Sequence, residues 1–84
     1  MTPKEAVASV KKVHPNHVPT QVLDYDNDYY IVEALPKGVD KSSDDPYYAV
    51  EKKTGKVYFY HPGGDFIKFF DALDNRAIKI GDVK

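Results

Sequence analysis

In the stretch Asp45-Pro-Tyr-Tyr-Ala-Val-Glu-Lys-Lys-Thr-Gly-Lys-Val-Tyr-Phe-Tyr60, the turn, the register and both faces of a β-hairpin can be recognised. Its two arms are rich in aromatic and β-branched residues, which suit a pleated strand. Between the arms lies a four-residue loop, 52–55, whose last position takes a left-handed backbone. Gly55 supplies that conformation without a Cβ clash. The hairpin fixes part of the architecture but offers no chemistry.

The loop length sets the register. Four loop residues pair Glu51 with Lys56, and opposite charges across a ladder contribute roughly 0.2–1 kcal/mol. One face then carries Tyr48, Val50, Val57 and Phe59. The opposite face carries Tyr47, Ala49, Tyr58 and Tyr60. A three-residue loop is the alternative, but it mixes Val50 with tyrosines. We favour the first register because a one-residue slip reverses which side chains reach the core.

Composition limits the classes of protein to which this chain can belong. Its 84 residues predict a single domain, 1–84. The absence of cysteine excludes a disulfide scaffold and a thiolate zinc site. A net charge of −1 argues against a broad nucleic-acid surface. We see no secretory signal and no apolar run of ~20 residues, so we expect a cytoplasmic protein without membrane contact, although a mature secreted fragment would look similar.

The N-terminal half predicts one helix and two strands. A capping box formed by Thr2 and Glu5, with proline at the first helical position, predicts a helix over 3–13. Residues 18–25 and 29–35 are typical of strands, and Pro19 favours an edge position for the first. The polar loop 36–46 that follows is long enough to be either mobile or a binding loop.

After the hairpin, the sequence predicts a turn, a helix and a short strand. Asp65 is placed to cap a helix over 65–74 whose apolar residues keep helical spacing, with Asn75 as its end. Residues 77–80 alternate like a strand. We therefore expect an α+β fold with an N-terminal helix, an antiparallel sheet of three to four strands, and a C-terminal helix packed on one sheet face. Both helices are expected to cover the same face, giving two layers.

Two patterns resemble metal sites. Carboxylates alternate over 24–28 as in a calcium loop, but Tyr29 stands where the loop needs glycine and Leu35 where it needs glutamate. We interpret this segment as a solvated hairpin turn. His14 and His17 flank a proline and are expected to diverge or to remain loop residues. Since a metal needs three or four converging ligands, we expect neither a metal nor a cofactor.

Two further patterns resemble catalytic or anion sites. His61-Pro-Gly-Gly-Asp65 precedes a helix, where backbone N–H groups can bind an anion, but Asp65 would compete for them. We interpret it as a strand-to-helix turn. The serines, at 9, 42 and 43, show no nucleophile–base–acid arrangement. We therefore expect that the protein is not an enzyme. A hydrolase that pairs Ser42 or Ser43 with a histidine is the third interpretation.

Surplus aromatic residues form the best candidate site. Eight of the eleven aromatic side chains lie between Tyr47 and Phe70. The expected protein interface consists of Tyr47, Tyr58, Tyr60, Lys53 and Lys56. Tyrosine is enriched in interfaces because it offers large contact area with few rotatable bonds. The alternative is that another part of the chain covers these rings, and RNA stacking is a weaker possibility.

Three segments together resemble the PepSY domain family: the helix Thr2–Val13, the strand Tyr29-Tyr-Ile-Val-Glu33 and the hairpin Tyr48-Ala-Val-Glu-Lys-Lys-Thr-Gly-Lys-Val57. That family packs a capped helix on a small antiparallel sheet with a Thr-Gly hairpin. Its members are usually exported and linked to peptidase inhibition, and no catalytic residues carry over. This chain departs from the family by lacking a signal and by adding the helix 65–74. The Pro-Tyr-Tyr-Ala-Val run also resembles small uncharacterised proteins of bacteria and their phages.

The function expected from the sequence is protein binding. Our first hypothesis is a small non-enzymatic module, regulatory or inhibitory, that presents the tyrosine face or the 36–46 loop to a partner. The second is a self-associating structural or assembly protein, as a phage would encode.

Overall fold

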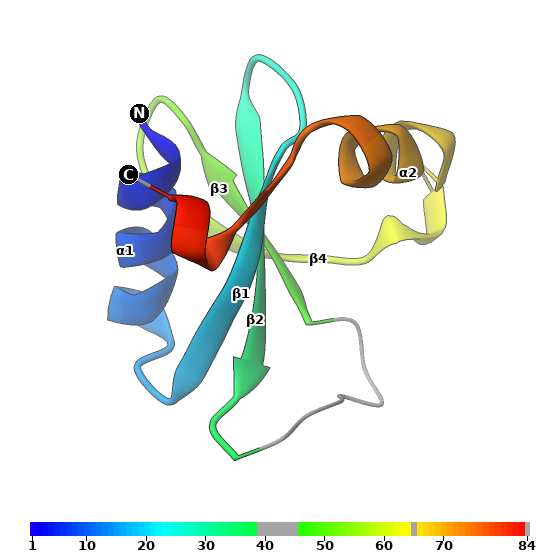
Figure 1. Cartoon of the computed structure of the whole chain (residues 1–84). Coiled ribbons are helices and arrows are strands. Elements are labelled where there is room, and N and C mark those ends of the chain that lie inside the picture. The colour runs from blue at the N-terminus through cyan, green and yellow to red at the C-terminus, as the bar shows by residue number, and fades with distance from the viewer. Residues whose placement is uncertain (39–45, 65, 84) are drawn as a thin grey trace.

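The computed structural model describes residues 1–38, 46–64 and 66–83, and its centre is a five-stranded antiparallel sheet (Figure 1). The strands are β1 (His17–Asp24), β2 (Tyr29–Pro36), β3 (Tyr47–Glu51), β4 (Val57–Tyr60) and β5 (Ala77–Lys79), in the spatial order β4-β3-β2-β1-β5. The helices are α1 (Pro3–Val13) and α2 (Phe66–Asn75), with 3-10 turns η1 (Pro62–Gly64) and η2 (Ile80–Asp82). The α+β class is confirmed, and the sheet has one strand more than expected.

The β3–β4 hairpin has the predicted register. Tyr47 pairs with Tyr60 and Val50 with Val57. The Gly55 N–H donates to the Glu51 carbonyl at 2.7 Å, and Gly55 adopts a φ of 77°. The pairing is therefore confirmed, together with the reason for glycine at 55. The Gly55 bond encloses only residues 52–54, and the Glu51 N–H donates to the Lys56 carbonyl at 2.9 Å, so Gly55 and Lys56 both oppose Glu51 in a glycine bulge, which is the loop form of the alternative.

Helix α1 begins with the predicted capping box. The Thr2 hydroxyl accepts from the Glu5 N–H at 3.2 Å, and the Glu5 carboxylate accepts from the Thr2 N–H at 3.0 Å. These two bonds satisfy N–H groups that the first turn of a helix leaves without partners. The helix buries Ala6 and Val10 against the sheet.

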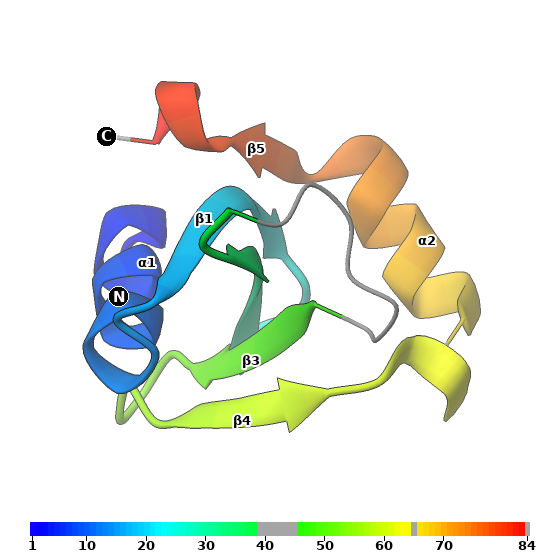
Figure 2. The ribbon, with the colours of Figure 1, turned by 90° about the horizontal axis from the view of Figure 1, so that it is seen from below.

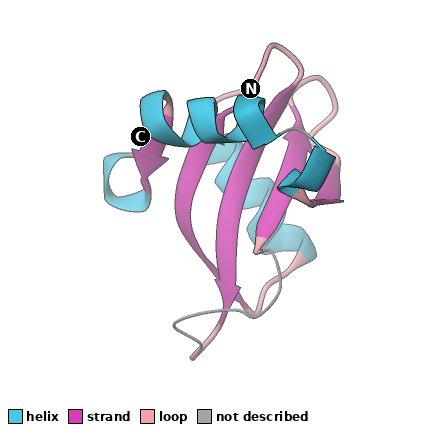
Figure 3. Ribbon diagram, turned by 90° about the vertical axis from the view of Figure 1, so that its right-hand side faces the viewer, coloured by secondary structure: helices cyan, strands magenta, loops and turns pink. Residues whose placement is uncertain are grey.

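The two helices cover opposite faces of the sheet, so the expectation of a shared face is wrong. Helix α1 packs on the face that carries Val32 and Val50, whereas α2 packs on the face that carries Leu23 and Ile31. Figure 2 shows the strands between the two helices, and Figure 3, seen from the α2 side, shows α1 behind the sheet. The reason lies in β2, whose residues 30–32 are all buried, because both faces of this strand are apolar.

Strand β1 lies inside the sheet, although Pro19 predicted an edge. Strand β5 pairs only with Gln21, Val22 and Leu23. Pro19 lies before this paired part, next to a register shift in the β1–β2 ladder. Its missing N–H therefore breaks no ladder with β5, which is how an interior strand accommodates proline.

The remaining predictions are confirmed in part. Helix α2 ends at Asn75 and is followed by the short strand β5, as expected. Asp65, the predicted cap of this helix, lies outside the described residues. Residues 39–45 also lie outside them. They include most of the expected binding loop and both serines of the hydrolase interpretation. Within the described residues, neither helix has the length and apolar character needed to cross a membrane.

Candidate functional site: a tyrosine pocket beside an open sheet edge

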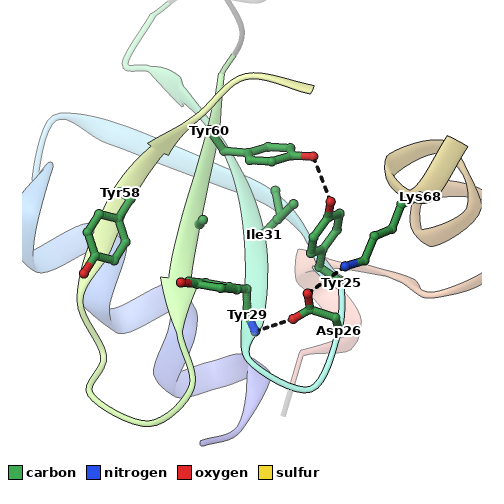
Figure 4. A pocket seen from close by; sticks show the side chains of 8 residues that line it. Tyr25, Asp26, Tyr29, Ile31, Tyr58, Tyr60 and Lys68 are labelled. Atoms are coloured by element: carbon green, nitrogen blue, oxygen red, sulfur yellow. Dashed lines mark hydrogen bonds and ion pairs between the residues drawn. The ribbon is translucent and has the colours of Figure 1, made fainter. Parts of the chain in front are cut away.

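A pocket of about 380 Å³ lies on the α2 side of the sheet (Figure 4). Its lining residues are Tyr25, Asp26, Tyr29, Ile31, Ala49, Tyr58, Tyr60 and Lys68. In Figure 4, Tyr58 and Tyr29 stand on one side of Ile31 and Tyr25 and Lys68 on the other, while the Tyr60 ring crosses above Ile31 towards Tyr25. The lining comes from the β1–β2 turn, three strands and α2, so only the folded chain assembles it.

One wall of the pocket is a pair of tyrosines. The hydroxyls of Tyr60 and Tyr25 are 3.3 Å apart in a hydrogen bond, and their rings meet edge to face with centroids 5.5 Å apart. Tyr60 also lies against Phe69 of α2, with ring centroids 5.8 Å apart. This wall is therefore held by β4, by the β1–β2 turn and by α2 together.

The charged part of the pocket is an ion pair between the β1–β2 turn and α2. Lys68 Nζ lies 2.9 Å from Asp26 Oδ2 and 4.6 Å from the centroid of the Tyr25 ring. Asp26 Oδ1 accepts the backbone N–H groups of Asp28 and Tyr29, each at 2.8 Å. Burial raises the pKa of Asp26, but the hydrogen bond from Lys68 and those two N–H groups outweigh it and lower the pKa below its ordinary value.

The alternating carboxylates of 24–28 form a hairpin turn, as the sequence predicts. Asp24 pairs with Lys52 at 2.8 Å and Asp26 pairs with Lys68. Asp26 bonds locally to the backbone two and three residues on, as aspartate does in turns. In the described part of the chain no group of three or more histidines or carboxylates is arranged to hold a metal ion.

His14 and His17 lie together, so they do not diverge, but His14 is a loop residue, as the other expected outcome had it, and His17 begins β1. Their ring centroids are 5.2 Å apart, and both rings lie against Tyr48, at 4.6 and 5.7 Å. The tight turn between them closes with a 3.1 Å bond from the His17 N–H to the His14 carbonyl. His61 stacks on Phe59 instead, at 5.3 Å. The histidines thus extend an aromatic cluster on the α1 side.

The structure divides the predicted interface residues into three groups. Tyr47 packs edge-on against Phe69 of α2, with ring centroids 4.9 Å apart. For Tyr47, therefore, another part of the chain covers the ring, as the alternative expected. Tyr58 and Tyr60 line the pocket, as do Tyr25 and Tyr29. Lys53 and Lys56 are exposed around the β3–β4 turn, away from the pocket lining.

Sequence reasoning missed the apolar surface of α2 and the charged part of the pocket. Phe66, Ile67 and Phe70 are 53%, 89% and 48% exposed, and the rings of Phe66 and Phe70 stack 5.6 Å apart. The helical spacing that predicted α2 made Phe66 and Phe70 look like core, and it did not include Ile67. No local signal pairs Lys68 with Asp26, because 42 residues separate them.

Strand β4 is the edge of the sheet in the part of the chain that the structure describes. The Glu51 N–H donates to the Lys56 carbonyl at 2.9 Å, so these two residues form a hydrogen-bonded pair. Hydrogen-bonded and non-hydrogen-bonded pairs alternate along an antiparallel ladder. The backbone N–H and C=O groups of Val57 and Phe59 therefore point away from β3, towards the outer edge. Tyr58 and Phe59, at 45% and 58% exposure, add aromatic surface on the two faces beside it.

Comparison with known proteins adds no relative: no family model, curated protein or solved structure matched the chain.

Proposed function

We propose that this chain is a small non-enzymatic protein-recognition module that binds an extended segment of a partner along β4. The observation that carries the proposal is the open edge of β4, with outward-facing backbone groups at Val57 and Phe59 and exposed rings at Tyr58 and Phe59. A peptide that adds a strand to such an edge gains main-chain hydrogen bonds, and its alternate side chains contact the two faces.

The composition of β4 supports binding by strand addition. An exposed apolar edge strand is a liability in a monomer, and proteins usually blunt one with charges, bulges or proline. Strand β4, Val57-Tyr-Phe-Tyr60, is short, which limits this liability, but it contains no charge and no proline. Its tyrosines also line the pocket, so a strand placed on the edge would lie beside a hollow able to take a side chain.

Selection of random displayed peptides on the immobilised protein tests the proposal. We expect peptides that bind in extended form and that fail to bind Phe59→Pro. Proline at 59 removes an N–H that points outward and leaves the ladder with β3 intact, as proline in edge strands does. Phe59→Ala is the matched control because it removes the same ring but keeps the N–H.

The expected result is that Phe59→Ala weakens the selected peptides and Phe59→Pro abolishes their binding, with both variants folded by circular dichroism. Equal binding by the two variants contradicts strand addition, and a selection that enriches no peptide contradicts the function. A regulatory or inhibitory role, of the kind the PepSY resemblance implies, and a cytoplasmic location remain parts of this proposal.

Self-association is the second candidate function, and the exposed apolar surface of α2 favours it. A strand added to β4 does not require Phe66, Ile67 or Phe70 to be exposed, whereas an assembling protein would bury them against a second copy. Light scattering over a concentration series tests this candidate. We expect growth in mass that Ile67→Lys suppresses. A strict monomer at high micromolar concentration contradicts it.

A further inference from the structure

We propose that the tyrosine pocket binds the cationic head of a basic side chain, lysine or arginine, presented by the partner segment. The inference rests on the proposed function for the source of the cation. The chemistry of the pocket stands on its own contacts.

The pocket already holds an ammonium group of this chain. Lys68 Nζ lies over the Tyr25 ring, 4.6 Å from its centroid, and 2.9 Å from the Asp26 carboxylate. An aromatic face and an anion thus converge on one cation, which is the arrangement that recognises alkylammonium groups. The Lys68 side chain is 50% exposed, so exchanging it for another cation costs little, as for surface ion pairs generally.

The cavity that remains when Lys68 is in place has a lining that supports the same ligand. Tyr29, Tyr58 and Tyr60 line it together with two apolar residues, Ile31 and Ala49. The apolar lining suits the methylene stem of a lysine or arginine, and phenol faces attract its head. A volume of about 380 Å³ leaves room for the stem of such a side chain, whose head takes the place of the Lys68 ammonium at Asp26 and Tyr25.

Ligands of other charge gain less from the pocket. Asp26 and Lys68 neutralise each other, so the ion pair alone favours neither an anion nor a cation. The tyrosine faces break this balance, because their quadrupoles are negative above the ring. A cation that displaces Lys68 also gains the Asp26 carboxylate, whereas a neutral stem of the same length would contact only the apolar lining at Ile31 and Ala49.

The test uses blocked single amino acids as probes: the N-acetyl amides of lysine, arginine, norleucine and glutamate. Norleucine has the methylene stem without the charge, and glutamate reverses the charge. Binding is followed by the NMR shifts of the Tyr25 and Tyr60 ring protons at fixed ionic strength, on the wild type and on variants. Lys68→Met removes the competing ammonium and keeps a stem of similar length. Lys53→Met makes the same charge change outside the pocket and is its matched control.

We expect Lys68→Met to bind the lysine and arginine probes about tenfold more tightly than the norleucine probe, the magnitude of a partly desolvated cation–π contact with an ion pair. Asp26→Asn, which keeps an oxygen for the two turn N–H groups, should abolish this preference. Lys53→Met should bind as the wild type does. Equal binding of norleucine, tighter binding of glutamate, or no ring shift with any probe overturns the inference.

The displayed peptides separate this inference from the proposed function. If peptides are enriched but replacing their lysines and arginines by norleucine leaves binding unchanged, the cation site is wrong and the recognition module stands. If the probes bind as expected but no peptide is enriched, the recognition module is wrong and the cation site stands.

Discussion

Lys52 forms a salt bridge with Asp24, with Nζ 2.8 Å from Oδ1, that ties the turn of one hairpin to the end of the other. The same ammonium donates to the Asp26 carbonyl at 2.6 Å and lies 4.5 Å from the Tyr30 ring centroid. The Lys52 backbone N–H donates to the Asp28 carbonyl at 2.8 Å. Together with the hydrogen bond between Tyr60 and Tyr25, this lysine holds the β1–β2 turn that carries Asp26 against the second hairpin.

Removing the Lys52 ammonium should destabilise the fold. We expect Lys52→Met to lower the free energy of unfolding by about 1–2 kcal/mol, since a hydrogen bond to a charged group contributes about that much and the side chain is only 22% exposed. Lys53→Met, at the exposed neighbouring position, should change it by less than about 0.5 kcal/mol. Urea denaturation measures both, and equal losses would show that the salt bridge contributes nothing specific.

Alanine at position 55 should destabilise the β3–β4 turn. Gly55 has a φ of 77°, and a side chain in the left-handed region costs about 1–2 kcal/mol. An added Cβ would make only ordinary contacts, 3.4 Å from Met1 Cε, so the cost comes from the backbone. Gly81→Ala is the control, because Gly81 has no positive φ and open space around it. Thermal unfolding should show a lower midpoint for Gly55→Ala only, and a loss in both variants would be evidence against the turn argument.

Two phenylalanines of α2 should differ sharply in their contribution to stability. Phe69 is 2% exposed and packs against Tyr47 and Tyr60, so Phe69→Ala should cost about 3 kcal/mol or more. Phe70 is 48% exposed, and Phe70→Ala should cost less than about 1 kcal/mol. Chemical denaturation gives both values. Similar costs would mean that α2 does not cover the second face of the sheet through Phe69.

Asp26 should make the stability depend on pH in the acid range. Its pKa is lower in the folded chain than in the unfolded one, so its contribution is complete above the unfolded pKa, about 3.9, and is lost as pH falls through the folded value. The free energy of unfolding of Asp26→Asn should therefore fall less steeply than that of the wild type below about pH 4.

Asp74→Asn serves as the control for the acid range, since Asp74 is an exposed carboxylate on the same helix as Lys68. Stability is measured by urea titration at a series of pH values. If the free energy of unfolding of Asp26→Asn fell with pH as steeply as that of the wild type, the Asp26–Lys68 pair would not stabilise the fold.

Local features of the fold were predictable from the sequence. The hairpin register, the capping box of α1, the end of α2 at Asn75 and the strand β5 all appear as expected. The first three depend on residues close together in the chain, whereas β5 shows only its alternation locally and needs β1 as its partner. Gly55 selects the turn, Thr2 and Glu5 satisfy each other's backbone, and helical spacing marks α2. Such interactions compete with few alternatives, so pattern and propensity are enough to identify them.

The placement of α2 was not predictable in this way. Its apolar side fits any apolar sheet face, and this sheet has two, because β2 is apolar on both sides. The choice is made by η1, which leads the chain out of β4, and by β5, which pairs with β1 and fixes the far end of α2. With α2 held in this place by the β1–β5 pairing, Phe69 covers Tyr47, while Tyr58 stays 45% exposed.

By itself, the sequence determined the hairpin, the capped helix and the tyrosines at 58 and 60 as candidate surface. Only the tertiary structure decided that these rings would share a pocket with Asp26 and Lys68, 42 residues apart in the chain. The physical reason is the range of the interactions: a turn is stabilised within a few residues, whereas a pocket wall exists only after separate elements have packed against one sheet face.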